Sequence, residues 1–191
     1  MTIEDHWSES LLSVGPRHVR ACAEALEWAL GYPTREAAWK ACERSDWLFW
    51  YAGRLGVARE LVVLAACACA RTALQYVPAG EDRPRVAIET AEAWCRGEAT
   101  LSQVRSAADD AAAYAVYAAG DAAYAADAAA SVVDAAADAA AYAADAAAYA
   151  AVAADAAADT PTNARTWQAD LLRQWISWDE VGAAITAYQA K

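Results

Sequence analysis

Two histidines, five cysteines and one arginine-containing motif are the features of this 191-residue sequence that could support chemistry. His6 and His18 lack any cysteine or carboxylate at the spacing that a zinc site requires. Cys67 and Cys69 are two residues apart on an expected helix, so they face apart and suit neither a metal nor a disulfide. Because no nucleophile elbow, phosphate-binding glycine loop or H-E-x-x-H motif occurs, we expect no enzyme, no catalytic residue, no metal and no cofactor.

The arginine-containing motif is Asp82-Arg83-Pro84-Arg85, which stands where a helix is expected to begin. Helix N-termini and guanidinium groups both attract anions, so Arg83 and Arg85 with Trp94 can form a small anion or ligand pocket. The simpler interpretation is a capped helix start with an Arg–Asp pair. Both interpretations stay open at this point.

An alanine-rich segment, residues 107–160, carries most of the chain's net charge of −11. It contains 33 Ala, nine Asp and five Tyr but no Lys or Arg. On an ideal helix four of its Asp fall within about 40° of one another, and four Tyr fall in a neighbouring band. This stripe is either the solvated face that keeps such a helix soluble or a surface that captures a basic protein. The residues expected to contact a partner are Asp127, Asp134, Asp138, Asp145, Tyr142 and Tyr149.

Helical spacing and capping residues predict the elements that would position these groups. We expect a helix from Pro16 to before Gly31, one at 35–44 capped by Thr34, and one at about 47–55 capped by Ser45 or Asp46. Further helices are expected at 58–76, at 83–97, after Thr100, whose pairing with Gln103 resembles a capping box, and from 161 to the end.

The predicted fold is all-α, a single-domain bundle of about seven helices over residues 1–191. Residues 1–106 supply mixed helices, 107–160 a docked alanine-rich hairpin and 161–191 the closing helix. We expect a Trp-rich core drawn from residues 19–95 and 167–178. The closing helix would bury one face, formed by Trp167, Leu171, Trp175 and Trp178.

Composition also excludes several classes of protein. The net charge of −11 opposes binding to phosphate backbones and anionic lipid, so we expect neither a nucleic-acid reader nor a membrane protein. The longest uncharged apolar run, residues 61–70, is shorter than the ~20 residues of a membrane helix. The first residues lack a signal sequence and the cysteines are odd in number, which predicts a cytoplasmic chain with reduced thiols.

Short motifs carry a family resemblance. They are Ala66-Cys67-Ala68-Cys69-Ala70, Tyr76-Val77-Pro78, Asp82-Arg83-Pro84-Arg85, Ala87-Ile88-Glu89, Trp94, Arg96-Gly97-Glu98 and Thr166-Trp167-Gln168-Ala169-Asp170-Leu171-Leu172-Arg173. Together they resemble the "putative immunity protein" domains of bacterial polymorphic toxin systems, which also occur in phages and prophages. The resemblance spans about residues 40–178 and is most specific over 66–98.

The resemblance implies an all-α protein that binds a cognate toxin and neutralises it without catalysis. A nuclease toxin would suit the acidic segment, because nucleases present basic clefts. The main alternative is a phage counter-defence protein, either a mimic of nucleic-acid charge or a sponge that binds a small signalling nucleotide through Arg83 and Arg85. A scaffold that forms homo-oligomers through alanine faces is a further alternative. Ice binding is disfavoured, because Asp stands where regularly spaced Thr would be expected.

Overall fold

Helices form nearly all of the secondary structure in the described part of the chain. The computed structural model describes residues 13–14, 19–20, 22–115 and 161–190. In chain order the elements are β1 (Ser13–Val14), β2 (Val19–Arg20), α2 (Ala23–Leu30), α3 (Arg35–Ala41), α4 (Ser45–Leu55), α5 (Arg59–Arg71), the 3-10 helix η2 (Thr72–Tyr76), α6 (Arg83–Cys95), α7 (Leu101–Ala115), α10 (Pro161–Trp175) and α11 (Trp178–Gln189). The predicted all-α class is confirmed.

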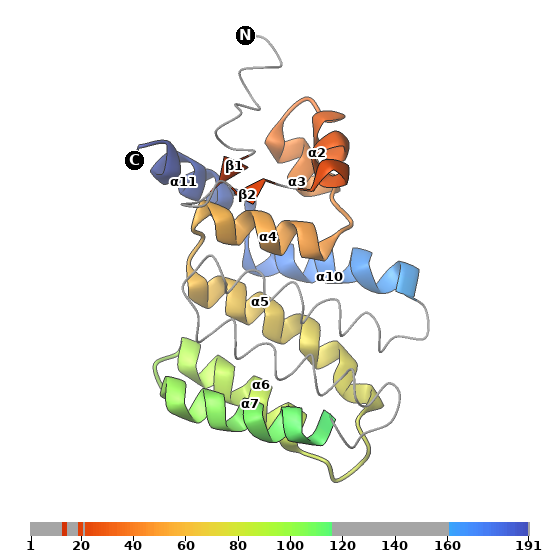
Figure 1. The fold of residues 1–191 in the computed structure, drawn as a ribbon, viewed down its shortest axis with the longest axis vertical. Helices are drawn as coiled ribbons and strands as arrows, with labels where there is room; N and C mark the ends of the chain where they lie inside the picture. The colour runs from red at the N-terminus through yellow and green to blue at the C-terminus, as the bar shows by residue number, and fades with distance from the viewer. Residues whose placement is uncertain (1–12, 15–18, 21, 116–160, 191) are drawn as a thin grey trace.

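The helices lie in a stack (Figure 1). Helices α6 and α7 pair at one end, and α5 packs on α6. Helix α10 returns from far along the sequence to pack against α5 and α4, and α11 contacts α4 and α3 near the opposite end. The C-terminal helices therefore complete a core that the N-terminal half begins.

Local sequence signals placed several helix ends correctly. The hydroxyl of Thr34 accepts a hydrogen bond from the amide of Ala37 at 3.1 Å, which caps α3. Helix α4 ends at Gly56, whose φ of 81° lies in the left-handed region that favours glycine. At the start of α7, the side-chain oxygens of Thr100 and Gln103 each accept a hydrogen bond from the other residue's backbone amide, as the capping-box pattern predicted.

The predicted first helix is wrong at its start. Residues 19–20 are extended and pair antiparallel with residues 13–14, so Val19 cannot belong to a helix from Pro16. Helix α2 begins only at Ala23, where the Cys22 sulfur accepts a hydrogen bond from Ala25 at 3.4 Å. Backbone pairing with a preceding segment outweighed the three-to-four spacing of apolar residues.

Small aliphatic residues and a few large side chains form the core. Phe49, Ile88, Leu172 and Ile176 are fully buried, as are many alanines of α5, α6 and α7. Alanine allows helix axes to approach closely, which explains how short helices share so continuous a core. An exposed ion pair between Arg71 and Glu92, with N–O distances of 2.7 and 2.8 Å, also joins α5 to α6.

Tryptophan contributes less to this core than the sequence predicted. Trp39 is buried, and Trp28, Trp47, Trp94 and Trp178 pack partly buried against the core. The closing-helix prediction is wrong for two residues, because Trp167 and Trp175 are 50% and 40% exposed. That helix is also two helices, since α10 ends at Trp175 and Ser177 caps α11 with a capping box to Glu180.

The buried face of α10 includes polar groups with specific partners. The hydroxyl of Ser45 donates to the side-chain oxygen of buried Gln168 at 3.1 Å. The guanidinium of Arg173 donates to the carbonyl oxygens of Trp39 and Cys42 at the end of α3. These bonds fix α10 against α3 and α4, and they select which face of α10 points inward.

All five cysteines are free thiols. Burial raises the pKa of Cys42 to about 11 and that of Cys69 to about 12, and it raises the pKa of Cys67 well above its usual range. These thiols therefore stay protonated and poorly nucleophilic at neutral pH. Among the described helices, none has the length and apolar character needed to cross a membrane.

Candidate functional site

The residues predicted to contact a partner are in the alanine-rich segment. Asp127, Asp134, Asp138, Asp145, Tyr142 and Tyr149 all lie outside the described residues. His6 and His18 also lie outside them. Within the described ranges, no group of three His, Cys, Asp or Glu side chains could hold a metal ion.

The start of the alanine-rich segment, residues 107–115, belongs to α7 and can be compared with the prediction. Ala107, Ala108 and Ala111 are buried against the core, whereas Asp109 and Asp110 are exposed. This first part of the segment therefore packs through alanine and turns its carboxylates to solvent. The sequence predicted this division of faces for the segment as a whole.

Tyr114 stands at the border between these two faces. The guanidinium of Arg83 lies over its ring, 4.9 Å from the ring centroid. This is a cation–π contact between α6 and α7. Hydrogen bonds from Arg83 to Glu81 raise the pKa of the Arg83 guanidinium, and the nearby Tyr114 and Asp110 raise it further. The first tyrosine of the segment thus holds an arginine, with an Asp one helical turn earlier.

The three residues of the predicted anion pocket do not meet in one site. Arg83 is paired with Glu81 at 2.5 Å, and Arg85 with Asp82 at 2.8 Å and Glu89 at 2.9 Å. Trp94 lies 11 residues after Arg83 on α6, about 16 Å away along the helix axis. The guanidinium of Arg59 lies over the Trp94 ring, 4.7 Å from its centroid. A phosphate would have to compete with these carboxylates for Arg83 and Arg85. The anion pocket at these residues stays a prediction.

The Arg83–Glu81 pair makes a testable prediction about pH. The hydrogen bonds from Arg83 lower the pKa of the Glu81 carboxyl from 4.5 to about 2. This pair therefore favours the folded state above about pH 4.5, and its contribution is lost as the pH falls toward about 2. In Arg83→Gln the guanidinium bonds are lost but the backbone amide of residue 83 still donates to Glu81, so we expect the pKa of this carboxyl to rise from about 2 toward its ordinary value of 4.5. Carbon-detected NMR of Glu81 would measure it, and an unchanged pKa in that variant would contradict the assignment.

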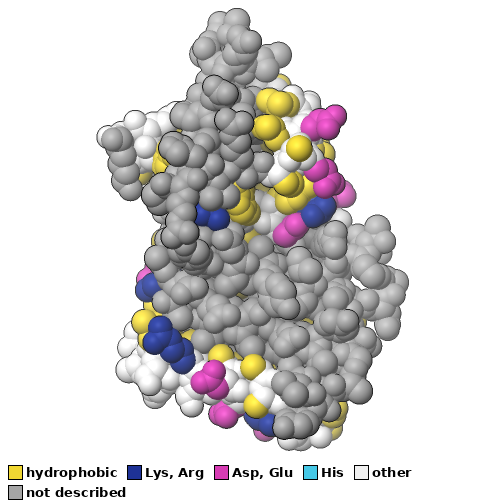
Figure 2. Space-filling model, viewed as in Figure 1, with side chains coloured by type: hydrophobic (Ala, Val, Ile, Leu, Met, Phe, Trp, Pro, Cys, Tyr) yellow, Lys and Arg dark blue, Asp and Glu magenta, His cyan; other side chains and the backbone are white. Residues whose placement is uncertain are grey.

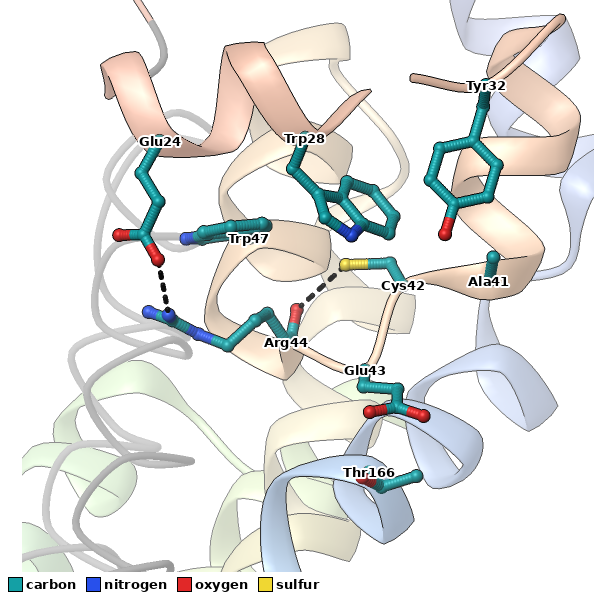
Figure 3. A pocket seen from close by; sticks show the side chains of 9 residues that line it. All are labelled: Glu24, Trp28, Tyr32, Ala41, Cys42, Glu43, Arg44, Trp47 and Thr166. Atoms are coloured by element: carbon teal, nitrogen blue, oxygen red, sulfur yellow. Dashed lines mark hydrogen bonds and ion pairs between the residues drawn. The ribbon is translucent and has the colours of Figure 1, made fainter. Parts of the chain in front are cut away.

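A cavity that the sequence did not predict opens between α2, α3, α4 and α10 (Figure 3). We call it the aromatic pocket; its volume is about 510 Å³. Trp28 and Tyr32 reach into it from α2 and the turn that follows, and Trp47 faces them from α4. The lining residues are Glu24, Trp28, Tyr32, Ala41, Cys42, Glu43, Arg44, Trp47 and Thr166.

The rings of the aromatic pocket stand at an angle to one another. The Trp28 ring lies 4.6 Å from Tyr32, tilted by 49°, and 5.7 Å from Trp47, tilted by 59°. Tilted rings present both faces and edges to the space that they enclose. Where α2 lies in Figure 1, the surface in Figure 2 shows hydrophobic side chains beside Asp and Glu.

The protein's own Arg44 side chain occupies part of the aromatic pocket. The guanidinium of Arg44 lies 4.6 Å from the centroid of the Trp47 ring. Two hydrogen bonds to Asp46, at 2.9 and 2.7 Å, hold it and raise its pKa. Glu24 is a looser neighbour at 3.8 Å, with a side chain 75% exposed. The site combines aromatic faces with carboxylates, which is the chemistry that recognises cations.

The chain matches a known protein family over more than half of its length. The model of the Imm-5 like putative immunity protein family matches residues 57–174, well over half of the sequence. The chain belongs to this family. No curated protein and no solved structure matches the chain.

The region matched by the immunity-protein family includes α5, α6, α7 and most of α10. Gln168 and Arg173, which fix α10 to the rest of the core, fall inside it. The walls of the aromatic pocket do not, apart from Thr166, because the other lining residues precede residue 57. Membership of this family suggests an inhibitor role and a protein partner.

Proposed function

We propose that this immunity-family protein neutralises a basic protein toxin by binding it through the acidic, tyrosine-bordered face of residues 107–160. Family membership supports the inhibitor role, and the charge distribution supports the sign of the partner. Nine Asp without one Lys or Arg attract a basic surface and steer its approach. A nuclease is the most suitable class of toxin, since its active site must bind phosphates.

The contact between Arg83 and Tyr114 is the observation that supports this mechanism best. It shows one tyrosine of the segment holding an arginine on its ring, with Asp110 four residues earlier. The same Asp-x-x-x-Tyr spacing recurs in the sequence at Asp138–Tyr142 and Asp145–Tyr149. On a helix, residues four apart lie on one face, so each pair can offer a ring and a carboxylate to one guanidinium.

Affinity capture from the lysate of the native host, at low and at high salt, tests the proposal. The variant Asp127→Asn, Asp134→Asn, Asp138→Asn, Asp145→Asn removes the stripe's charge and keeps its shape. We expect the wild type to retain one basic protein at low salt, and the variant to bind it at least about tenfold more weakly. Mass spectrometry identifies the protein, and calorimetry then measures the two affinities.

A matched control removes four exposed carboxylates from other parts of the chain, through Glu→Gln changes at residues 27, 60, 89 and 98. Its net charge equals that of the stripe variant, so a general charge effect would weaken both equally. We expect the control to bind like the wild type. Equal binding by the stripe variant and the wild type would contradict the proposed binding face.

A further inference from the structure

The aromatic pocket has a shape that a side chain of a partner could enter. Its volume of about 510 Å³ is within the ~300–1,000 Å³ range of sites that hold small ligands. Figure 3 shows Trp28 and Tyr32 descending toward Cys42 and Ala41, so their rings form one wall and the α3–α4 loop forms the floor. Helix α2, which supplies Trp28, has no buried residue, and its Trp28 ring packs against Tyr32, Trp47 and the core.

The charges around the aromatic pocket favour a cation. Asp46 bonds Arg44 through both carboxylate oxygens, which compensates the positive charge of this arginine, the one cationic side chain among the described residues of the lining. Glu24 and Glu43 then remain as two negative charges at the rim. Glu43 is exposed, and among the described residues it makes no ion pair.

The pocket also shows how it would hold such a cation. The guanidinium carbon of Arg44 lies over the Trp47 ring, 4.6 Å from its centroid. Guanidinium groups combine stacking on aromatic faces with paired hydrogen bonds to carboxylates, which ammonium groups cannot match. The burial of Cys42, which raises its pKa to about 11, keeps the floor neutral.

We propose that the aromatic pocket binds an arginine side chain of a basic protein partner. Its guanidinium lies against the rings of the pocket, and the carboxylates of Glu24 and Glu43 supply the negative charge that attracts it. The identity of the ligand as part of a protein rests on the proposed function above. The described residues that line the pocket, apart from Thr166, precede the family-matched residues 57–174, so the side chains that would choose the partner lie outside the matched region.

Titration of the full-length protein with Nα-acetyl-arginine methyl ester tests the inference. Each of the nine tryptophans has one indole N–H that NMR can observe, and single Trp→Phe variants assign the signals of Trp28 and Trp47. We expect these two signals to shift and saturate with a Kd of about 1 mM, typical of a fragment. Nα-acetyl-citrulline methyl ester has the same shape without the charge, and we expect it to bind at least about tenfold more weakly.

The variant Glu24→Gln, Glu43→Gln tests the carboxylates, and both positions are exposed enough to leave the fold intact. We expect it to weaken the arginine ester about tenfold, whereas the control Glu89→Gln, Glu98→Gln leaves binding unchanged. Equal binding of the citrulline ester, or unchanged binding by the pocket variant, would overturn the inference. Tighter binding of choline than of the arginine ester would overturn it in favour of a free quaternary ammonium.

The affinity capture described above separates this inference from the proposed function. If the pocket variant binds the captured protein as tightly as the wild type does, the pocket inference fails and the proposed function stands. If the arginine ester binds the pocket but no protein is captured, the proposed function fails, and with it the protein partner assigned to the pocket. A captured protein that binds both the pocket variant and the four-Asp stripe variant at least about tenfold more weakly supports both.

Discussion

Replacing Phe49 with alanine is expected to lower the free energy of unfolding by about 4 kcal/mol. Phe49 is the single phenylalanine of the chain, is fully buried, and lies on α4, which packs against α5, α10 and α11. Truncation removes the transfer free energy of the ring and leaves a cavity where three neighbouring helices meet. Urea unfolding followed by circular dichroism measures the loss, and we expect Tm to fall by roughly 10 °C.

Two further variants serve as comparisons for the loss of stability expected in Phe49→Ala. Phe49→Leu keeps most of the buried volume and should cost about 1–1.5 kcal/mol. Leu30→Ala removes a side chain that is 48% exposed at the end of α2, and it should cost less than about 0.5 kcal/mol. A loss below about 1 kcal/mol in Phe49→Ala would contradict the packing of α4 described above.

Helix ends were the best predicted part of the fold, because their signals are local. Thr34 caps a helix with an oxygen three residues from the amide that it satisfies, and Gly56 ends one by its own backbone conformation. Ser177 and Glu180 give the same kind of local signal, because they form the capping box that divides α10 from α11. The prediction of a single closing helix did not take this signal into account. A division of the closing helix was therefore readable in the sequence.

The inward face of α10 could not be predicted in the same way. Helical spacing shows that Trp167, Leu171 and Trp175 share a face, but it does not show which face is buried. The buried face instead contains Gln168, whose hydrogen-bond partner Ser45 is 123 residues earlier in the chain. Burial of a polar side chain costs less where such a partner exists, and that depends on the assembled fold.

The two candidate sites also differ in how far the sequence alone predicts them. The acidic stripe is a property of one segment, so its charge and spacing are visible in the sequence. The aromatic pocket is assembled from α2, α4, the loop between α3 and α4, and Thr166 of α10. The spacing of Trp28 and Tyr32, four residues apart, was the one local sign of it. Its third ring and its carboxylates come together only on folding.

Replacing Arg173 with methionine is expected to lower the free energy of unfolding by about 3 kcal/mol. Carbonyl groups at a helix C-terminus lack partners within the helix. Arg173 supplies them at the end of α3, since it donates to the Trp39 carbonyl at 3.1 Å and to the Cys42 carbonyl. Its side chain is 18% exposed, so water cannot readily replace both bonds. Urea unfolding of the variant measures the loss.

Lysine and asparagine substitutions separate geometry from charge at this junction. Arg173→Lys keeps the charge, but a single ammonium group cannot reproduce the fork that spans two carbonyls, so we expect a loss of about 1–2 kcal/mol. Asp170→Asn breaks only the exposed ion pair with Arg173, at 2.9 Å, and should cost less than about 1 kcal/mol. Wild-type stability in Arg173→Lys would contradict this prediction, because it would show that a positive charge alone joins α10 to α3.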